Sequence, residues 1–238
     1  MRIVTWNCCQ AFRTKWNYPD SFGPDVIVVP EAESIRRQPQ ALLQLYPNHQ
    51  WIGDNENKGL LVLSSDSYDL SIHESYDPSH RYVLPLQVSG SSEFTMLAVW
   101  TQRDKGASYT QHLSRALETY EPLLHGDALV VGDFNANTIW DQEHRRDVTH
   151  SENVAWLNDH GLESAYHFLT DENQGQESQF THAFRRNPNS LFHIDYVFAT
   201  KSLLGTGSSV TIPPISDWIG RSDHGPLVVE LRSDNTQE

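Results

Sequence analysis

The sequence predicts an α/β fold in which β-sheets pack against each other and helices cover their outer faces. Three observations carry this prediction: short apolar segments of strand length recur along the chain, few segments have helical spacing, and turn-forming residues separate these segments. With 238 residues, 38% of them hydrophobic, the chain can bury a sizeable core. No repeat or linker-like stretch divides it, so we expect a single domain over residues 1–238.

Eight segments are predicted to be strands because each is rich in Val, Ile, Leu or aromatic residues and is bounded by turn formers. In chain order, these segments are Ile3 to Trp6, Asp25 to Val29, Gly59 to Leu63, Tyr82 to Val88, Phe94 to Trp100, Leu129 to Val131, Ile194 to Ala199 and Leu227 to Leu231. Their number indicates a β-rich fold.

Helical spacing is clearest from Thr110 to Leu124, where apolar side chains recur every three or four residues. Ser34 to Leu45 and Ser151 to His160 show weaker helical patterns. Because these segments lie between strands, we expect them to cover the outer faces of packed sheets. We also expect a polar surface loop from Asp171 to Ser178 and a frayed tail from Ser233 to Glu238.

The charge of the chain bears on its partners. With 31 acidic and 17 basic residues, the formal charge is −14, whereas nucleic-acid-binding proteins usually present a basic surface. This charge therefore makes a small phosphate substrate more plausible than it would otherwise be. No run of eighteen apolar residues and no leader pattern is present, so we expect a soluble, cytoplasmic, monomeric protein with no membrane partner.

The two cysteines, Cys8 and Cys9, are adjacent in the sequence. Neighbouring residues on an extended strand point to opposite faces, so we expect no structural disulfide between them. Two neighbouring thiols also offer too few soft ligands for a metal-thiolate site. This cysteine usage fits a reducing cytoplasm.

The informative pattern is a set of polar residues placed where hydrophobic strands begin or end. One acidic residue at a strand end is usually a turn former or a helix cap. Five such places carry only amides, carboxylates and one imidazole, namely Asn7, Glu31, Asp133 with Asn135, Asp195, and Asp223 with His224.

Together these groups suit the hydrolysis of a phosphate ester. A hard cation such as Mg²⁺ takes oxygen ligands and keeps several waters, so one or two carboxylates and an amide suffice to hold it beside a phosphate. Carboxylates and an asparagine can orient and deprotonate a water molecule, and a histidine can donate a proton or hydrogen bonds to the phosphoryl group. We therefore interpret the seven residues as one hydrolytic site.

Five ordered motifs resemble those of the endonuclease/exonuclease/phosphatase superfamily, which includes deoxyribonuclease-I-type and exonuclease-III-type enzymes. They are TWN at 5–7, PE at 30–31, GDFNAN at 132–137, HIDYVF at 193–198 and SDHGPL at 222–227. The resemblance implies a four-layer α/β sandwich, with two mixed or mostly antiparallel sheets face to face and helices outside. It also implies hydrolysis that depends on Mg²⁺, for which Mn²⁺ can substitute.

The resemblance assigns the metal ligands. It makes Glu31 the principal ligand, supported by Asn7 and by Asp223. The sequence departs from the family near these positions: Pro precedes Glu31 where exonuclease-III-type enzymes usually have Gln, and Cys9 stands where some relatives carry an acid or amide. A second metal site is therefore unsupported.

The resemblance also assigns catalytic roles. Asp133 would orient or deprotonate the attacking water, and Asn135 would hold a phosphate oxygen or the nucleophile. Asp195 would pair with His224 and favour its protonated form, which suits an anionic phosphate. His224 would then stabilise the pentavalent phosphorane or act as the acid.

Substrate contacts are less specific in the sequence. Lys58 and Arg81 precede strands and are candidates to approach a phosphodiester backbone, although ordinary surface charge explains each as well. Trp140 follows the GDFNAN motif and could stack on a base or fill the core. Many relatives place a His or Tyr at the end of the strand that here ends in Trp100-Thr101, and His182 is the candidate substitute.

Three functions remain open from the sequence. The first is a DNA-directed nuclease, favoured by the resemblance and by the compact length. The second is a small-molecule phosphomonoesterase or phosphodiesterase, because a small phosphate needs only the local field of a metal. The third is a binding module that has lost activity, which the presence of all seven residues disfavours.

Overall fold

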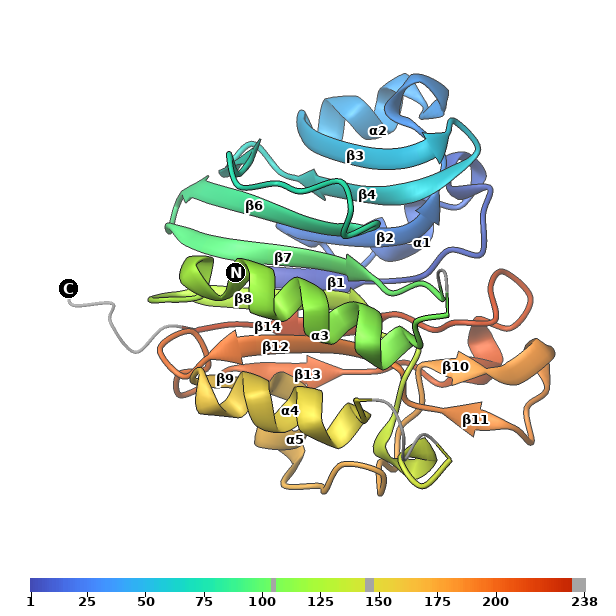
Figure 1. Ribbon diagram of the computed structural model, residues 1–238. Helices are drawn as coiled ribbons and strands as arrows, with labels where there is room; N and C mark the ends of the chain where they lie inside the picture. The colour runs from blue at the N-terminus through green and yellow to red at the C-terminus, as the bar shows by residue number, and fades with distance from the viewer. Residues whose placement is uncertain (104–105, 144–147, 233–238) are drawn as a thin grey trace.

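Two six-stranded β-sheets pack face to face in the protein, with helices on their outer faces (Figure 1). The computed structural model describes residues 1–103, 106–143 and 148–232. The expected α/β sandwich is therefore confirmed. The tail predicted from Ser233 to Glu238 lies outside the described residues.

The first sheet contains both ends of the described chain. In spatial order its strands are β13 (Ser209–Thr211), β14 (Leu227–Glu230), β1 (Arg2–Thr5), β2 (Val26–Ala32), β4 (Lys58–Ser64) and β3 (Asn48–Asn55). Strand β1 pairs parallel with β2 and antiparallel with β14, so the sheet is mixed.

The second sheet is also mixed, because β7 and β8 pair in parallel and the other neighbours pair antiparallel. Its spatial order is β5 (Tyr68–Ile72), β6 (Val83–Gly90), β7 (Phe94–Trp100), β8 (Ala128–Asp133), β12 (Asp195–Thr200) and β9 (Leu162–Ser164). A separate two-stranded hairpin pairs β10 (His182–Ala183) with β11 (Leu191–Phe192).

Three apolar clusters fill the three interfaces of this sandwich. The largest lies between the sheets and combines side chains such as Ile3 and Val28 with Met96 and Val131. A second lies under α3 (Tyr109–Tyr120) and α4 (His150–Asp159) on the outer face of the second sheet. The third covers the outer face of the first sheet, where α2 (Gln40–Leu45) contributes Leu42.

The remaining helical elements are short. The α-helices are α1 (Asn17–Asp20) and α5 (Ala165–Thr170). The 3₁₀ turns are η1 (Phe12–Thr14), η2 (Ile35–Arg37), η3 (Glu121–Leu123), η4 (Thr138–Trp140), η5 (Phe184–Arg186) and η6 (Ile215–Asp217). None of the described helices is long and apolar enough to cross a membrane.

The prediction of one helix from Ser34 to Leu45 was wrong. The structure has the 3₁₀ turn η2 and the separate helix α2, because Pro39 takes an extended conformation between them. Proline lacks a backbone donor and disfavours helix at the preceding residue, so a continuous helix cannot pass through this position. The helix predicted from Thr110 to Leu124 is likewise divided into α3 and η3, with Pro122 at the division.

The strand ends explain how distant motifs meet. The carboxyl ends of parallel strands lie on one edge, and an antiparallel neighbour begins on that same edge. The last residues of β1, β2 and β8 and the first residues of β12 and β14 therefore share one side of the sandwich. This side is the right-hand side in Figure 1, where the β10–β11 hairpin also lies.

Candidate active site

Asp133 occupies the centre of the polar cluster on this side of the sandwich. It ends β8 and its side chain is fully buried. Its Oδ2 accepts a hydrogen bond from Asn7 Nδ2 at 2.9 Å, and its Oδ1 accepts one from the backbone N of Asn135 at 2.8 Å. The structure thus joins the first and third motifs, which lie 126 residues apart, through one carboxylate.

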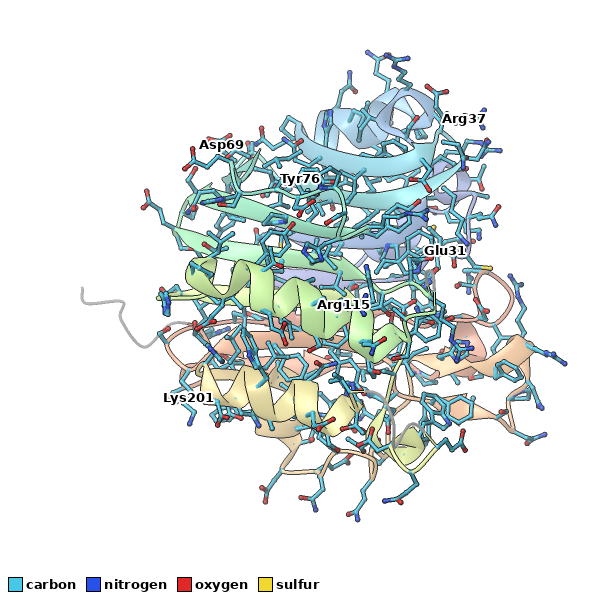
Figure 2. The ribbon with its side chains drawn as sticks, viewed as in Figure 1. Glu31, Arg37, Asp69, Tyr76, Arg115 and Lys201 are labelled. Atoms are coloured by element: carbon cyan, nitrogen blue, oxygen red, sulfur yellow. The ribbon has the colours of Figure 1, made fainter. Side chains whose placement is uncertain are left out.

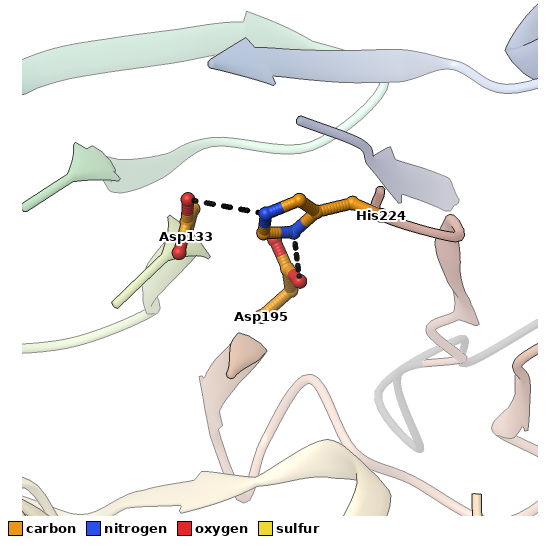
Figure 3. Close-up of side chains that lie close together, drawn as sticks. All are labelled: Asp133, Asp195 and His224. Atoms are coloured by element: carbon orange, nitrogen blue, oxygen red, sulfur yellow. Dashed lines mark hydrogen bonds and ion pairs between the residues drawn. The ribbon is translucent and has the colours of Figure 1, made fainter. Parts of the chain in front are cut away.

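Asp195 lies directly opposite Asp133 in the pairing of β12 with β8. Two carboxylates facing each other across neighbouring strands repel one another. The imidazole of His224 relieves this repulsion: its Nδ1 is 2.9 Å from Asp195 Oδ2 and its Nε2 is 4.0 Å from Asp133 Oδ2 (Figure 3). The three side chains form a chain of alternating charge, and all three are buried.

The electrostatics favour a protonated His224. Burial opposes the charged ring, but the negative charges of Asp195 and Asp133 and the hydrogen bond to Asp195 outweigh burial and raise the pKa of His224 to about 10. Burial and the charge of Asp195 raise the pKa of Asp133, against the opposing charge of His224. The site therefore presents a cation next to a carboxylate of increased basicity.

Glu31 does not simply follow β2, as the sequence indicated, but lies within that strand at a β-bulge. The pairing with β4 shifts register between Pro30 and Ala32, and Glu31 has a φ of 65°. A left-handed conformation costs energy in a residue other than glycine, and bulges redirect side chains next to functional sites. Glu31 points out on the right-hand side of the molecule in Figure 2.

Asn135 is the second strained residue of the site, with a φ of 50°. Three positions earlier, Gly132 has a φ of 145°, and a Cβ there would lie 1.8 Å from the carbonyl oxygen of Val99. Only glycine permits this approach of β8 to β7. The GDFN motif thus has a backbone reason for its glycine and a strained turn that directs its asparagine.

Lys58 pairs with Glu31, with Nζ 3.1 Å from Oε2, and lies 4.9 Å from the ring centre of Trp100. It therefore reaches the proposed metal ligand, which the sequence alone could not show. Arg81 is placed differently: it pairs with Asp54 and lies over Tyr82. Its contact with substrate stays a prediction.

Asp223 and His182 meet on the other flank of His224. His182 Nε2 lies 3.9 Å from Asp223 Oδ2, and the rings of His182 and His224 are 4.6 Å apart. Burial and the charge of His224 lower the pKa of His182 to about 4, so it is neutral near pH 7. The structure brings His182 to the site, as its candidate role requires.

The described residues contain one group of three acidic or histidine side chains close enough to hold a metal ion, Asp133, Asp195 and His224, whose ligand atoms lie within 4.8 Å of one another. A protonated imidazole has no lone pair for a metal, so this group acts as an ion-pair network while His224 is charged.

Glu31 and Asn7 fit a hard cation better. The carboxylate of Glu31 is partly exposed and already accommodates the positive charge of Lys58. Asn7 Oδ1 accepts one hydrogen bond, from the backbone N of Cys9 at 3.0 Å, and an amide oxygen has two lone pairs. These oxygen donors have the chemistry that Mg²⁺ prefers.

Two hydroxyl groups that hold the site together were missed from the sequence. Ser222 Oγ donates to the backbone oxygen of Asn7 at 2.7 Å and accepts from the backbone N of His224 at 3.0 Å. Thr181 Oγ1 accepts from the backbone N atoms of Ile194 and Asp195, both at 3.1 Å. Ser222 belongs to the SDHGPL motif, which was its available signal, whereas Thr181 had none beyond its proximity to His182.

The polar loop predicted from Asp171 to Ser178 is tied to the site. Glu177 turns inward and accepts hydrogen bonds from Asn137 Nδ2 at 3.0 Å and from the backbone N of Gly175 at 2.9 Å. The ring of His167 lies 3.2 Å from the same carboxylate. Asn137 is the last residue of GDFNAN, so this hydrogen bond connects the loop to that motif.

Comparisons with known proteins identify the family of the chain. A profile of the endonuclease/exonuclease/phosphatase family matches residues 4–224. A comparison with curated protein sequences finds no match.

Three similar solved structures share the fold. An AP endonuclease from Archaeoglobus fulgidus has a TM-score of 0.68 at 18% identity, covering 97% of this chain and 99% of that one. A 3′-5′ exonuclease from Neisseria meningitidis has a TM-score of 0.61 at 18% identity, with coverage of 97% and 99%. A 3′ phosphatase from Neisseria bound to a product DNA hairpin has a TM-score of 0.62 at 18% identity, with coverage of 98% and 99%.

Proposed function

Because the chain belongs to the endonuclease/exonuclease/phosphatase family, whose members hydrolyse phosphoester bonds, we propose that it is a divalent-metal-dependent phosphodiesterase acting on DNA. The observation that carries this proposal is the buried His224 ring between two carboxylates, one of which accepts a hydrogen bond from Asn7. Such an arrangement suits a reaction in which negative charge increases on a phosphoryl group.

His224 stabilises that charge in the proposed mechanism. Its Nδ1–H is held by Asp195, so Nε2–H is the proton directed at the phosphate side of the site. Asp195 fixes the orientation of the ring in the way that a carboxylate orients a catalytic histidine elsewhere. Ser222 holds the backbone of His224, which limits how far the ring can move.

Asp133 is the proposed base for the attacking water. Its two oxygens are held by Asn7 and by the backbone of Asn135, so the carboxylate has a fixed direction. Its raised pKa makes it a better proton acceptor than an ordinary aspartate. Asn135, whose φ is 50°, would hold the water or a phosphate oxygen.

Glu31 and Asn7, supported by Asp223, would hold the cation, which we propose to be Mg²⁺ with Mn²⁺ as a substitute. When bound, the cation would polarise a phosphoryl oxygen as a Lewis acid. Lys58 contacts Glu31 and would then contact the phosphate as well as that carboxylate.

DNA is the proposed substrate because similar solved structures include an AP endonuclease and a Neisseria protein described both as a 3′-5′ exonuclease and, bound to a DNA hairpin, as a 3′ phosphatase. The alternative substrate is a small phosphoester, which the charge of −14 favours. We further propose that the chain is a single domain and acts as a monomer in the cytoplasm.

Activity assays test the proposal. The protein should hydrolyse plasmid DNA, an abasic-site duplex or a bis-aryl phosphate in Mg²⁺ or Mn²⁺, lose that activity in EDTA, and regain it when metal is added back. Activity that persists in EDTA would remove the metal from the mechanism. Hydrolysis of the bis-aryl phosphate alone would favour a small substrate, and no turnover of any substrate would favour a binding module.

A further inference from the structure

A cavity of about 550 Å³ opens next to the active site, between the β10–β11 hairpin and the η4 turn. Asn135, His182 and Asp223 line it, so it shares a wall with the site. We call it the aromatic pocket, because its other walls include four aromatic side chains, Tyr109, Trp140, Phe184 and Phe192. Its size falls within the range of small-molecule sites.

Two separate elements, η4 and β11, contribute aromatic rings to the pocket. Trp140 from η4 and Phe192 from β11 contact each other with ring centres 4.9 Å apart. His182 stacks on Phe192 at 6.2 Å, which connects these rings to the catalytic side. Phe184 remains 48% exposed, although an aromatic side chain of this size usually finds cover.

Charged groups line the same pocket. Arg103 lies over Tyr109 at 4.8 Å, and Arg185 lies over Phe184 at 5.1 Å. Asp141 and Glu143 also line the pocket. Aromatic rings beside charged groups suit a ligand that has flat faces and a polar edge better than a purely apolar ligand.

The hairpin that supplies His182, Phe184, Arg185 and Phe192 to the pocket is hydrogen-bonded to the backbone of Asp223. Ala183 N donates to Asp223 O at 2.7 Å, and His182 forms a β-bridge with His224. Its tip is strained, because Arg185 has a φ of 54°. Strain at such a tip costs energy and is kept where it places a side chain for function. The aromatic pocket therefore has a defined position relative to His224.

We propose that the aromatic pocket binds the base of the nucleotide whose phosphate enters the active site. The inference rests on the proposed function, because it takes the phosphate to be held by the residues around His224. A nucleobase has two aromatic faces and a hydrogen-bonding edge, which match the rings and the charged lining of the pocket. Stacking of a base on an aromatic side chain is sequence-tolerant, so the pocket would accept more than one base.

A base can enter a pocket of this kind only after it has left the helical stack. Unstacking is least costly at single-stranded or frayed ends. The enzyme should therefore prefer single strands and strand ends with an intact base over the interior of a duplex.

Binding measurements test the pocket separately from catalysis. Deoxyadenosine 5′-monophosphate and deoxyribose 5-phosphate are titrated by calorimetry in EDTA, which stops the proposed hydrolysis. The nucleotide should bind about tenfold more tightly than the sugar phosphate, as expected for one stacked base. Phe184→Ala should remove most of this advantage.

Phe168→Ala is the matched control. Phe168 lies on α5, is also 48% exposed and does not line the pocket, so its loss should leave the tenfold advantage unchanged. Equal binding of the two ligands to the wild-type protein would overturn the proposal, as would equal behaviour of the two variants.

The same variants distinguish the pocket from the proposed function. If no phosphoester is hydrolysed but the base advantage is lost only in Phe184→Ala, the pocket stands and the proposed function fails. If DNA is hydrolysed with the same kcat/KM whether or not the nucleotide at the scissile phosphate carries a base, the proposed function stands and the pocket fails.

Discussion

Two buried histidines beside the second sheet, His224 and His150, are opposite in charge. His224 is almost fully buried between Asp195 and Asp133, and its pKa is raised to about 10. His150, at the start of α4, is 1% exposed, and burial lowers its pKa to about 4. Burial penalises the charged ring in both places, so the facing carboxylates account for the difference.

The surroundings of His150 show why it stays neutral. Its ring lies 5.0 Å from that of Tyr196 and 6.4 Å from that of Phe134. Neither ring nitrogen has a hydrogen-bond partner among the residues that the structure describes. His193 nearby is fully buried as well, and burial lowers its pKa too.

The charge of a buried histidine thus depends on the carboxylates that face its ring. Asp195 and Asp133 raise the pKa of His224, whereas burial lowers the pKa of His193, which lies only two positions before Asp195 in the sequence. Near His150, the carboxylate of Glu177 lies 3.2 Å from the ring of His167 and accepts a hydrogen bond from the backbone N of Gly175.

Replacing His224 by Ala removes the charged ring and should lower kcat on any hydrolysed phosphodiester by about 10³-fold. The fold should persist, because the backbone of this segment is held by Ser222 and Trp6. Steady-state kinetics and circular dichroism measure the two effects. His150→Leu is the matched control: it removes a buried histidine without a carboxylate partner and should keep near-normal kcat. Near-normal rates in His224→Ala would disprove the role assigned here.

Replacing Asp195 by Asn keeps the side-chain shape but removes the charge that faces His224. We expect kcat to fall about 10²-fold, because the ring loses the hydrogen bond that orients it and its pKa falls. KM should change little, because the phosphate contacts remain. The kcat and KM values of the purified variant provide the check. A change in KM alone would show that Asp195 acts in binding rather than through His224.

The neutral histidine should affect stability rather than catalysis. The pKa of His150 is about 4 in the folded protein, below its usual value of 6.5, so the unfolded chain takes up the proton first as the pH falls. The stabilisation is thus complete above about pH 6.5 and is lost between about pH 6.5 and 4. From pH 7 to 5 this contribution falls by about 2 kcal/mol.

Urea unfolding at pH 7 and pH 5 measures this loss. His150→Leu, which cannot be protonated, should lose about 2 kcal/mol less than the wild-type protein over this interval. Equal losses in the two proteins would show that His150 is not neutral in the folded state.

Much of the site was visible in the sequence, because catalytic groups at strand ends interrupt hydrophobic segments. The motif GDFNAN predicted both Asp133 and Asn135, and HIDYVF predicted Asp195 within its strand. The aromatic pocket was not visible as a unit, since Trp140 and Phe192 are 52 residues apart and each resembles an ordinary core residue. Glu177 was hidden for the opposite reason, because its segment has the polarity of a solvent-exposed loop.

The fold class and the candidate site residues could both be predicted from the sequence, because hydrophobic periodicity and residue chemistry are local properties of the chain. The tertiary structure decided which of these residues face one another. It set Asp195 opposite Asp133 through strand register and aimed Glu31 through a bulge. Charge state and orientation depend on neighbours that are distant in sequence, so only the folded chain could show that His224 is the charged histidine and His150 the neutral one.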